Sequence, residues 1–255
     1  NESQVEGHPW YINQEYNNHR DATYEEILHL VHDYGIGIDG HNSFPGAMPE
    51  YQSEIREAQK IALSNNLWGI DAERWINELI DENSLTQEYL AALIDSYYGL
   101  WGAWTDSNTH GMWGIYVAKT RDEILTEDPI GAEIMNNKFF HPHLTYNARI
   151  DSSFNGNFSL RFDSSKPYTN HSQYLKDITL LGSNDISVSI NQLDNNITGN
   201  QGINTVIFSG NSSEYIINIS DNKASVIDKI SDRDGINILQ NIEKLEFKDQ
   251  TIELN

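Results

Sequence analysis

The sequence predicts an α+β protein in which a helical N-terminal domain is followed by a C-terminal β domain. All six tryptophans and most of the nine histidines lie within residues 1–150. Apolar residues recur there at helical spacing, whereas beyond residue 150 they alternate with polar residues and are separated by Gly, Asn and Asp turns. We therefore expect a helical domain at residues 1–150, a connecting strand and linker at 151–177, and a β domain at 178–255.

Capping and breaking residues define the predicted helices. Asp21 to Thr23 can cap the first helix, Pro49 suits the first turn of the second, and Asp71 can cap the third. Thr120 and Glu123 have the spacing of a capping box. The predicted helices are residues 24–34, 50–65, 72–81 and 84–98, a short helix from 120 to about 129, and 131–140.

The second part of the chain shows the period of two that is typical of strands with one buried face. Phe154, Phe158, Leu160 and Phe162 lie among small or polar residues, and short β-branched runs follow them. The predicted strands after residue 177 are 178–181, 186–190, 205–208, 215–219, 224–227 and 245–247.

The composition excludes several functional classes. A net charge of −22 disfavours binding to the phosphates of nucleic acids and makes divalent cations the natural small partners. The chain has no cysteine, which excludes disulfides and thiolate chemistry. We find no run of about eighteen apolar residues, so we expect no membrane span.

A glycine-rich loop that leads into a short strand occupies residues 199–207 and reads Gly-Asn-Gln-Gly-Ile-Asn-Thr-Val-Ile. A second turn, Asp-Arg-Asp-Gly at 232–235, precedes the run Ile-Asn-Ile-Leu-Gln and the closing strands. Together these segments resemble the C-terminal region of repeats-in-toxin (RTX) proteins, including the serralysin-type proteins that bacteria export by type I secretion. The resemblance covers about a third of the chain.

This resemblance implies a degenerate RTX-like parallel β-roll or β-sandwich in an extracellular bacterial protein, with calcium in the turns. The implied calcium-binding residues are Gly199, Asn200, Gly202 and Asn204. Asn200 and Asn204 occupy positions where the family has Asp, and the lost charges would weaken calcium binding. A weak calcium site and a metal-free turn both remain open.

The densest group of metal-competent side chains lies at residues 25–33, Glu-Glu-Ile-Leu-His-Leu-Val-His-Asp. On a helix, Glu25, His29 and His32 fall within a sector of about 60°. Imidazoles one turn apart can bind zinc or another transition metal, and Glu26 beside them can act as a base for a water molecule. His41 and Glu88 are the best candidates to complete the ligand set.

The alternative is an ordinary amphipathic helix whose histidine face is solvated. In that arrangement the core-facing residues are Tyr24, Ile27, Leu28, Val31 and Tyr34. The serralysin zinc signature His-Glu-x-x-His does not occur in the chain, so the resemblance of the C-terminal region carries no peptidase residue over to the first domain.

A second cluster, Trp101, Trp104 and Trp113, lies among glycines and can form either a substrate-binding platform or part of the core. The leading functional hypothesis is a secreted metal-dependent hydrolase, with peptidases among the candidate activities, that carries a calcium-binding RTX-like domain. The alternative is a non-catalytic extracellular module for calcium-dependent adhesion or for binding carbohydrate or protein.

Overall fold

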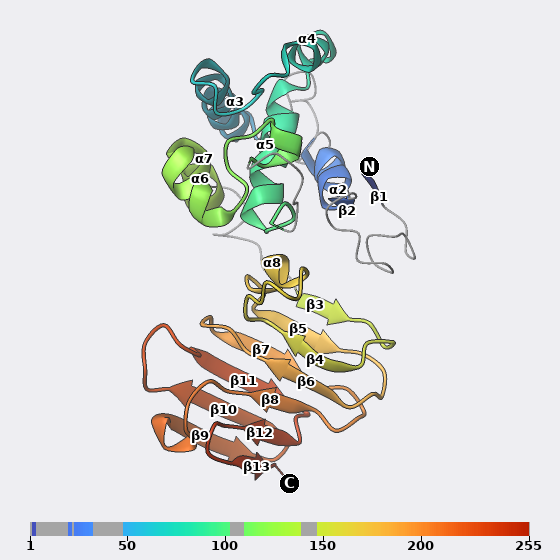
Figure 1. The fold of residues 1–255 in the computed structure, drawn as a ribbon, viewed down its shortest axis with the longest axis vertical. Helices are drawn as coiled ribbons and strands as arrows, with labels where there is room; N and C mark the ends of the chain where they lie inside the picture. Colours follow the sequence, from blue (N-terminus) through green and yellow to red (C-terminus); the bar gives the residue numbers. More distant parts are fainter. Residues whose placement is uncertain are drawn as a thin grey trace. The chain divides into compact units, whose positions relative to one another are not determined.

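A computed structural model describes residues 2–3, 20–21, 23–32, 48–102, 110–138 and 147–254. The chain is α+β and divides into two compact units, residues 1–145 and 146–255. The first is helical and the second consists almost entirely of strands (Figure 1). Residues 151–177, where the sequence predicts a connecting strand and linker, contain strand β4 (Gly156–Ser159) and the short helix α8 (Thr169–Ser172) of the second unit, and strand β3 (Asn147–Ile150) lies directly before them.

The helices of the first unit begin largely where the sequence predicts. Pro49 occupies the first turn of its helix, and Thr120 and Glu123 form the predicted capping box. Asp71 does not cap the third helix, because its backbone is left-handed, with φ of 52°, and the helix begins after Ala72. The helices are α2 (Thr23–Val31), α3 (Pro49–Ser64), α4 (Glu73–Glu82), α5 (Leu85–Tyr97), η2 (Met112–Gly114), α6 (Arg121–Glu127), α7 (Pro129–Glu133) and η3 (Ile134–Lys138), and the short strands β1 (Glu2–Ser3) and β2 (Arg20–Asp21) pair in parallel.

Helix α5 forms the centre of the helical unit, and α2, α3, α4 and α6 pack against it (Figure 1). Its residues are almost all buried, including Tyr89, whose hydroxyl donates a 2.7 Å hydrogen bond to the buried carboxylate of Asp128. Tyr116 donates a second bond, of 3.0 Å, to the same oxygen. Asp128 also caps α7 through the amide of Gly131, so one carboxylate joins three segments.

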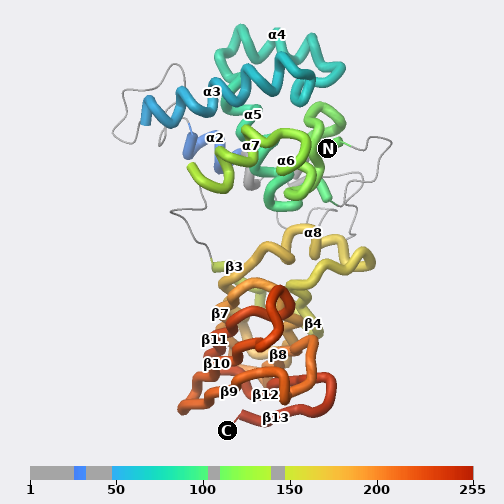
Figure 2. The backbone as a smooth tube through the Cα atoms, turned by 90° about the vertical axis from the view of Figure 1, so that its left-hand side faces the viewer, coloured from blue at the N-terminus to red at the C-terminus, as the bar shows by residue number. Residues whose placement is uncertain are grey.

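Two sheets form the second unit, and the chain passes from one to the other at each connection from β3 to β9 and again between β11 and β12. The first sheet has the order β3-β5-β7-β11-β10-β9, and the second has the order β13-β12-β8-β6-β4. Figure 2 shows the two layers edge-on. The elements are β3 (Asn147–Ile150), β4 (Gly156–Ser159), α8 (Thr169–Ser172), β5 (Asp177–Leu180), β6 (Ile186–Ser189), β7 (Asn195–Thr198), β8 (Thr205–Ile207), η4 (Ser212–Glu214), β9 (Tyr215–Ser220), β10 (Lys223–Asp228), β11 (Ile236–Gln240), β12 (Lys244–Glu246) and β13 (Thr251–Glu253).

Within each sheet most neighbouring strands pair in parallel, namely β3, β5, β7 and β11 in the first sheet and β4, β6, β8 and β12 in the second. Residues at equivalent positions of these strands therefore lie side by side. β9 and β10 interrupt this winding as an antiparallel hairpin, and β13 closes the second sheet in the antiparallel sense. The alternation of apolar and polar residues directs one face of each strand into a shared core. The inward rows are Ile178–Ile197–Leu239–Ala224 in the first sheet and Phe158–Val188–Val206–Leu245–Ile252 in the second.

Candidate functional site

Helix α2 turns its histidine side toward the interior of the helical unit. Leu28 and His32 are buried and His29 is half-buried. The aliphatic side chains of Ile27, Leu30 and Val31 are instead 57 %, 61 % and 42 % exposed. This orientation contradicts the alternative in which Ile27 and Val31 face the core and the histidines are solvated.

The inward orientation has a physical cause, because His32 finds polar partners inside the unit. Its Nε2 lies 2.7 Å from Oε1 of Gln52 on α3, and Nε2 of Gln52 donates a 3.0 Å hydrogen bond to Oγ1 of Thr86 on α5. A buried imidazole would otherwise lose a hydrogen bond that water provides. Since Gln52 engages Nε2, an ion bound by His32 would have to approach Nδ1.

Gln52 and Thr86 were not among the residues predicted from the sequence. A signal for Gln52 does exist, because it lies three residues before the buried Ile55 and so occupies the apolar stripe of α3. A polar residue in such a stripe requires a buried partner. The identity of that partner follows only from the packing of α2 on α3 and α5.

His29 and Glu88, two of the predicted metal ligands, lie next to each other. Nε2 of His29 is 3.5 Å from Oε1 of Glu88, and each side chain is 19 % exposed. The two residues come from α2 and from the first turn of α5, and they lie 59 positions apart in the sequence. An imidazole nitrogen and a carboxylate oxygen at partly exposed positions are typical ligands of zinc.

The remaining predicted residues of this site lie apart or outside the described residues. Glu26 is exposed on α2, three positions before His29. The side chain of Glu25, and the whole of His41, lie outside the described residues. Within the ranges given for the described chain, no group of three or more His, Asp or Glu side chains could hold a metal ion.

The predicted aromatic platform belongs largely to the core. Trp101 is 1 % exposed and packs edge-on against Trp113, with ring centroids 5.1 Å apart. Trp113 is half-buried, and Trp104 lies outside the described residues. A buried ring cannot offer its face to a sugar, so Trp101 contributes packing rather than a contact surface.

The predicted calcium loop is held together by its own amides. Oδ1 of Asn204 accepts a 2.6 Å bond from the backbone N–H of Asn200, and Oδ1 of Asn200 accepts from Gly202 N and Asn204 Nδ2, both at 2.8 Å. A Cβ on Gly199 would lie 1.8 Å from the carbonyl oxygen of Asn241, so the close approach of the two segments requires glycine. Calcium binding by this loop stays a prediction.

The β unit also contains a network of charges that the sequence analysis did not identify. The buried carboxylate of Asp234 accepts bonds from Ser209 N and Oγ at 2.7 and 2.8 Å, from Tyr215 Oη at 2.6 Å and from the guanidinium of Arg161. Burial, and then the bond to Asp234, raise the pKa of the Tyr215 hydroxyl well above its usual value.

Arg233 forms the second half of this network. It donates two bonds, of 2.7 and 2.6 Å, to Asp228 and one of 2.8 Å to Glu214. Burial of Asp228 opposes its ionisation, but the bonds from Arg233 and from backbone amides outweigh this effect and hold the pKa of Asp228 below its usual value. These bonds join η4, the end of β10 and the loop before β11, which is a structural role.

No protein-family model, curated protein or solved structure matches this chain. Among the helices of the described residues, none combines the length and the apolar composition that crossing a bilayer requires. A functional proposal therefore rests on the arrangement of the residues themselves.

Proposed function

We propose that the protein is a metal-dependent hydrolase whose ion is bound by His29 and Glu88, with His32 beside them. The observation that carries this proposal is the 3.5 Å approach of His29 Nε2 to Glu88 Oε1. It is supported by the orientation of α2, which exposes aliphatic side chains and directs its histidines inward. A solvated amphipathic helix would have the opposite arrangement.

Different residues would orient the metal ligands and act as the base. Gln52 orients the ring of His32 through Nε2, as an outer partner of a metal-binding histidine commonly does. Glu26 lies three positions before His29, so the two side chains are neighbours on the surface of α2. Glu26 is exposed to solvent and is the candidate base that accepts a proton from water. A bound zinc-like cation would supply Lewis acidity and lower the pKa of a water molecule. The substrate bond is then a peptide or ester open to attack by water.

Zinc titration of the full chain, after removal of metal by a chelator, tests the proposal. His29→Ala and Glu88→Gln should each weaken zinc affinity by about a hundredfold or more, because each removes a ligand. Glu82→Gln, which changes an exposed carboxylate on α4, should leave affinity unchanged. Glu26→Gln should retain zinc and lose turnover of protein and ester substrates.

Two outcomes would contradict the proposal. One is unchanged zinc affinity in the His29→Ala, Glu88→Gln double variant, and the other is equal hydrolysis by that variant and the wild type. Tryptophan fluorescence during urea unfolding checks that the helical unit is intact, since all six tryptophans lie in residues 1–150.

For the second unit we propose a degenerate RTX-like parallel β-roll in an extracellular protein exported by type I secretion. Support comes from the strands that alternate between two sheets and from the glycine-dependent turn at 199–202. Weak calcium sites would stabilise this unit by roughly 1–3 kcal/mol at millimolar calcium. Hydrogen exchange should then slow within 178–254 and not within 48–102, and equal protection with and without calcium would contradict calcium binding.

A second candidate function is a non-catalytic extracellular module that binds carbohydrate or protein. The observation in its favour is an apolar row on the outer face of the first sheet, where Ile216, Ile227 and Ile236 are neighbours on adjacent strands. Ile216 and Ile236 are exposed, and Ile238 adds a third exposed side chain. Such rows mark interaction surfaces when they are contiguous. Purified protein without a stoichiometric transition metal or any hydrolytic turnover would favour this module.

A further inference from the structure

Two asparagines face the core of the β unit at equivalent positions of adjacent strands. Asn195 begins β7, Asn237 is the second residue of β11, and the two are direct partners in the parallel pairing. Both are buried, with exposed fractions of 1 % and 0 %. They point to the same side as the inward residues Ile197 and Leu239, two positions further along.

The amide nitrogens of both side chains have partners, and this fixes the orientation of the two amides. Nδ2 of Asn195 lies 3.3 Å from the carbonyl oxygen of Leu175 and 3.4 Å from that of Lys176. Nδ2 of Asn237 donates a 2.7 Å bond to the carbonyl oxygen of Asp234. Exchanging oxygen and nitrogen in either amide would bring two acceptors together, so neither assignment can be reversed.

The amide oxygens are in the opposite situation. Neither Oδ1 of Asn195 nor Oδ1 of Asn237 has a hydrogen-bond partner in the part of the chain that the structure describes. Each buried acceptor without a partner would cost the full desolvation of a carbonyl group. The sheet order is β5-β7-β11, and the nitrogen of Asn195 faces the segment leading into β5. Its oxygen is therefore turned away from β5, and β11 is the neighbouring strand on the other side of β7.

We propose that one buried water molecule bridges Asn195 and Asn237 and donates a hydrogen bond to each Oδ1. A water molecule has two donors, which equals the number of acceptors to be satisfied, and adjacent strands are about 4.8 Å apart, within its span. A divalent cation fits less well, because calcium requires six to eight oxygen ligands. The guanidinium of Arg161, bonded to Asp234, also brings a positive charge to this corner.

The bridge lies where the regular winding of the unit is interrupted. The hairpin β9–β10 separates β8 from β11 along the chain, and Asn237 therefore pairs with a residue 42 positions before it in the sequence, Asn195. A shift by one residue would turn Asn237 to solvent and bring Ile236 or Ile238 inward. The water molecule can bond to both amide oxygens only in the observed register of β7 and β11. The bridge would therefore stabilise this register over a shifted one.

A crystal structure of the full chain at high resolution tests the proposal directly. The expected result is a density peak within hydrogen-bond distance, about 2.7–3.2 Å, of both Oδ1 atoms. A peak at about 2.3–2.6 Å with six or more oxygen neighbours would identify a cation and overturn the proposal. A direct bond from one asparagine amide to the other, with no peak, would overturn it as well.

Substitutions provide a second, independent measurement. Asn195→Leu and Asn237→Leu should each reduce hydrogen-exchange protection of β7 and β11 by about tenfold to a hundredfold, because each leaves buried groups without partners. The double variant should lose less protection than the sum of the two single variants, because the shared water is lost only once, whereas each substitution also removes its own Nδ2 bonds. Additive losses would refute a shared water. Asn218→Leu, at an exposed position of β9, is the matched control and should change protection less than threefold.

Discussion

Asp234 is the residue whose replacement by asparagine should destabilise the β unit most. The substitution preserves size and shape but turns one carboxylate oxygen into an NH₂ group. Each oxygen of Asp234 accepts bonds from two donors, Arg161 and Ser209 Oγ on one side and Ser209 N and Tyr215 Oη on the other. Whichever way the new amide turns, its nitrogen faces two donors.

The magnitude follows from these bonds. A hydrogen bond to a charged group contributes about 1.5–3 kcal/mol, so losing two predicts a loss of about 3–6 kcal/mol in the free energy of unfolding. Arg161 is 38 % exposed, and water can replace part of its interaction, which favours the lower end of this range. Tyr215→Phe removes one such bond and should cost about 1.5–3 kcal/mol.

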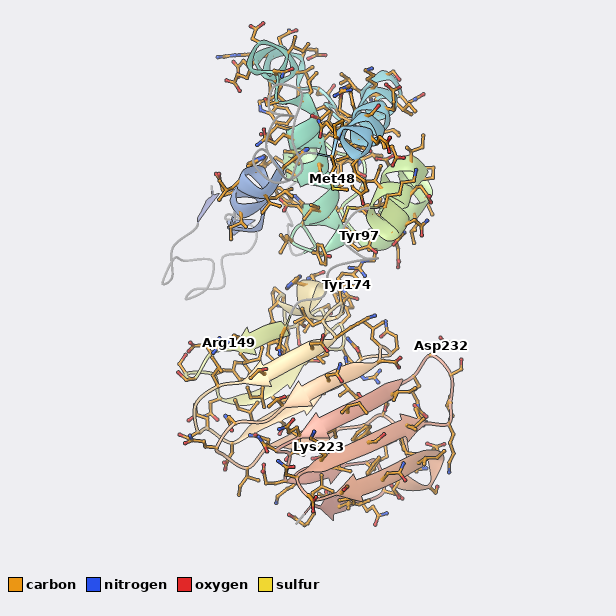
Figure 3. All side chains as sticks on the ribbon, turned by 180° about the vertical axis from the view of Figure 1, so that it is seen from behind. Met48, Tyr97, Arg149, Tyr174, Lys223 and Asp232 are labelled. Carbon is orange, nitrogen blue, oxygen red and sulfur yellow. The ribbon has the colours of Figure 1, made fainter. Side chains whose placement is uncertain are left out.

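The assay must separate the two units. Tryptophan fluorescence during urea unfolding follows the helical unit alone, because no tryptophan lies beyond residue 150. Hydrogen exchange of residues 147–254 follows the β unit. Asp232→Asn is the matched control: Asp232 is exposed at the tip of the loop between β10 and β11 (Figure 3), and asparagine tolerates its φ of 58°. We expect a change below about 0.5 kcal/mol for this control.

The reasoning would be refuted if Asp234→Asn and Asp232→Asn had equal effects on the β unit. It would also be refuted if Asp234→Asn shifted the fluorescence transition as much as the β transition. In a double-mutant cycle, the effects of Asp234→Asn and Tyr215→Phe should be less than additive, since both remove the same bond.

Three further predictions concern single features of the two units. Gly199→Ala should destabilise the β unit by more than about 2 kcal/mol in urea unfolding, because its Cβ would lie 1.8 Å from the carbonyl oxygen of Asn241; a wild-type transition would contradict this close approach. Thr120→Ala should cost the helical unit about 1 kcal/mol by removing the capping box of α6, which tryptophan fluorescence can measure. The pKa of Asp228 is lower in the folded state, so the stability from its pairing with Arg233 is present above about pH 4 and is lost as the pH falls through the folded pKa. Asp228→Asn should flatten this acid limb of stability, measured by hydrogen exchange of residues 147–254.

Local patterns determined most of the secondary structure from the sequence by itself. Pro49 and the capping box of Thr120 mark helix starts through bonds within one turn, and the alternation in β6 and β10 marks strands through a period of two. These signals come from residues only a few positions apart, so they can be recognised in the sequence alone. The α+β class and the order of helical and β parts follow from them.

Pairings between distant residues were decided only by the tertiary structure. The sequence of α2 is compatible with either face packing against the core. The hydrogen bond to Gln52 on α3 favours the arrangement in which His32 is buried and Ile27 is exposed. Likewise, Arg161 bonds to Asp234 only because the pairing of the strands brings these distant segments together. Buried polar groups need partners but do not specify them in the sequence, since the free energy of such a bond depends on which segments the packing brings together.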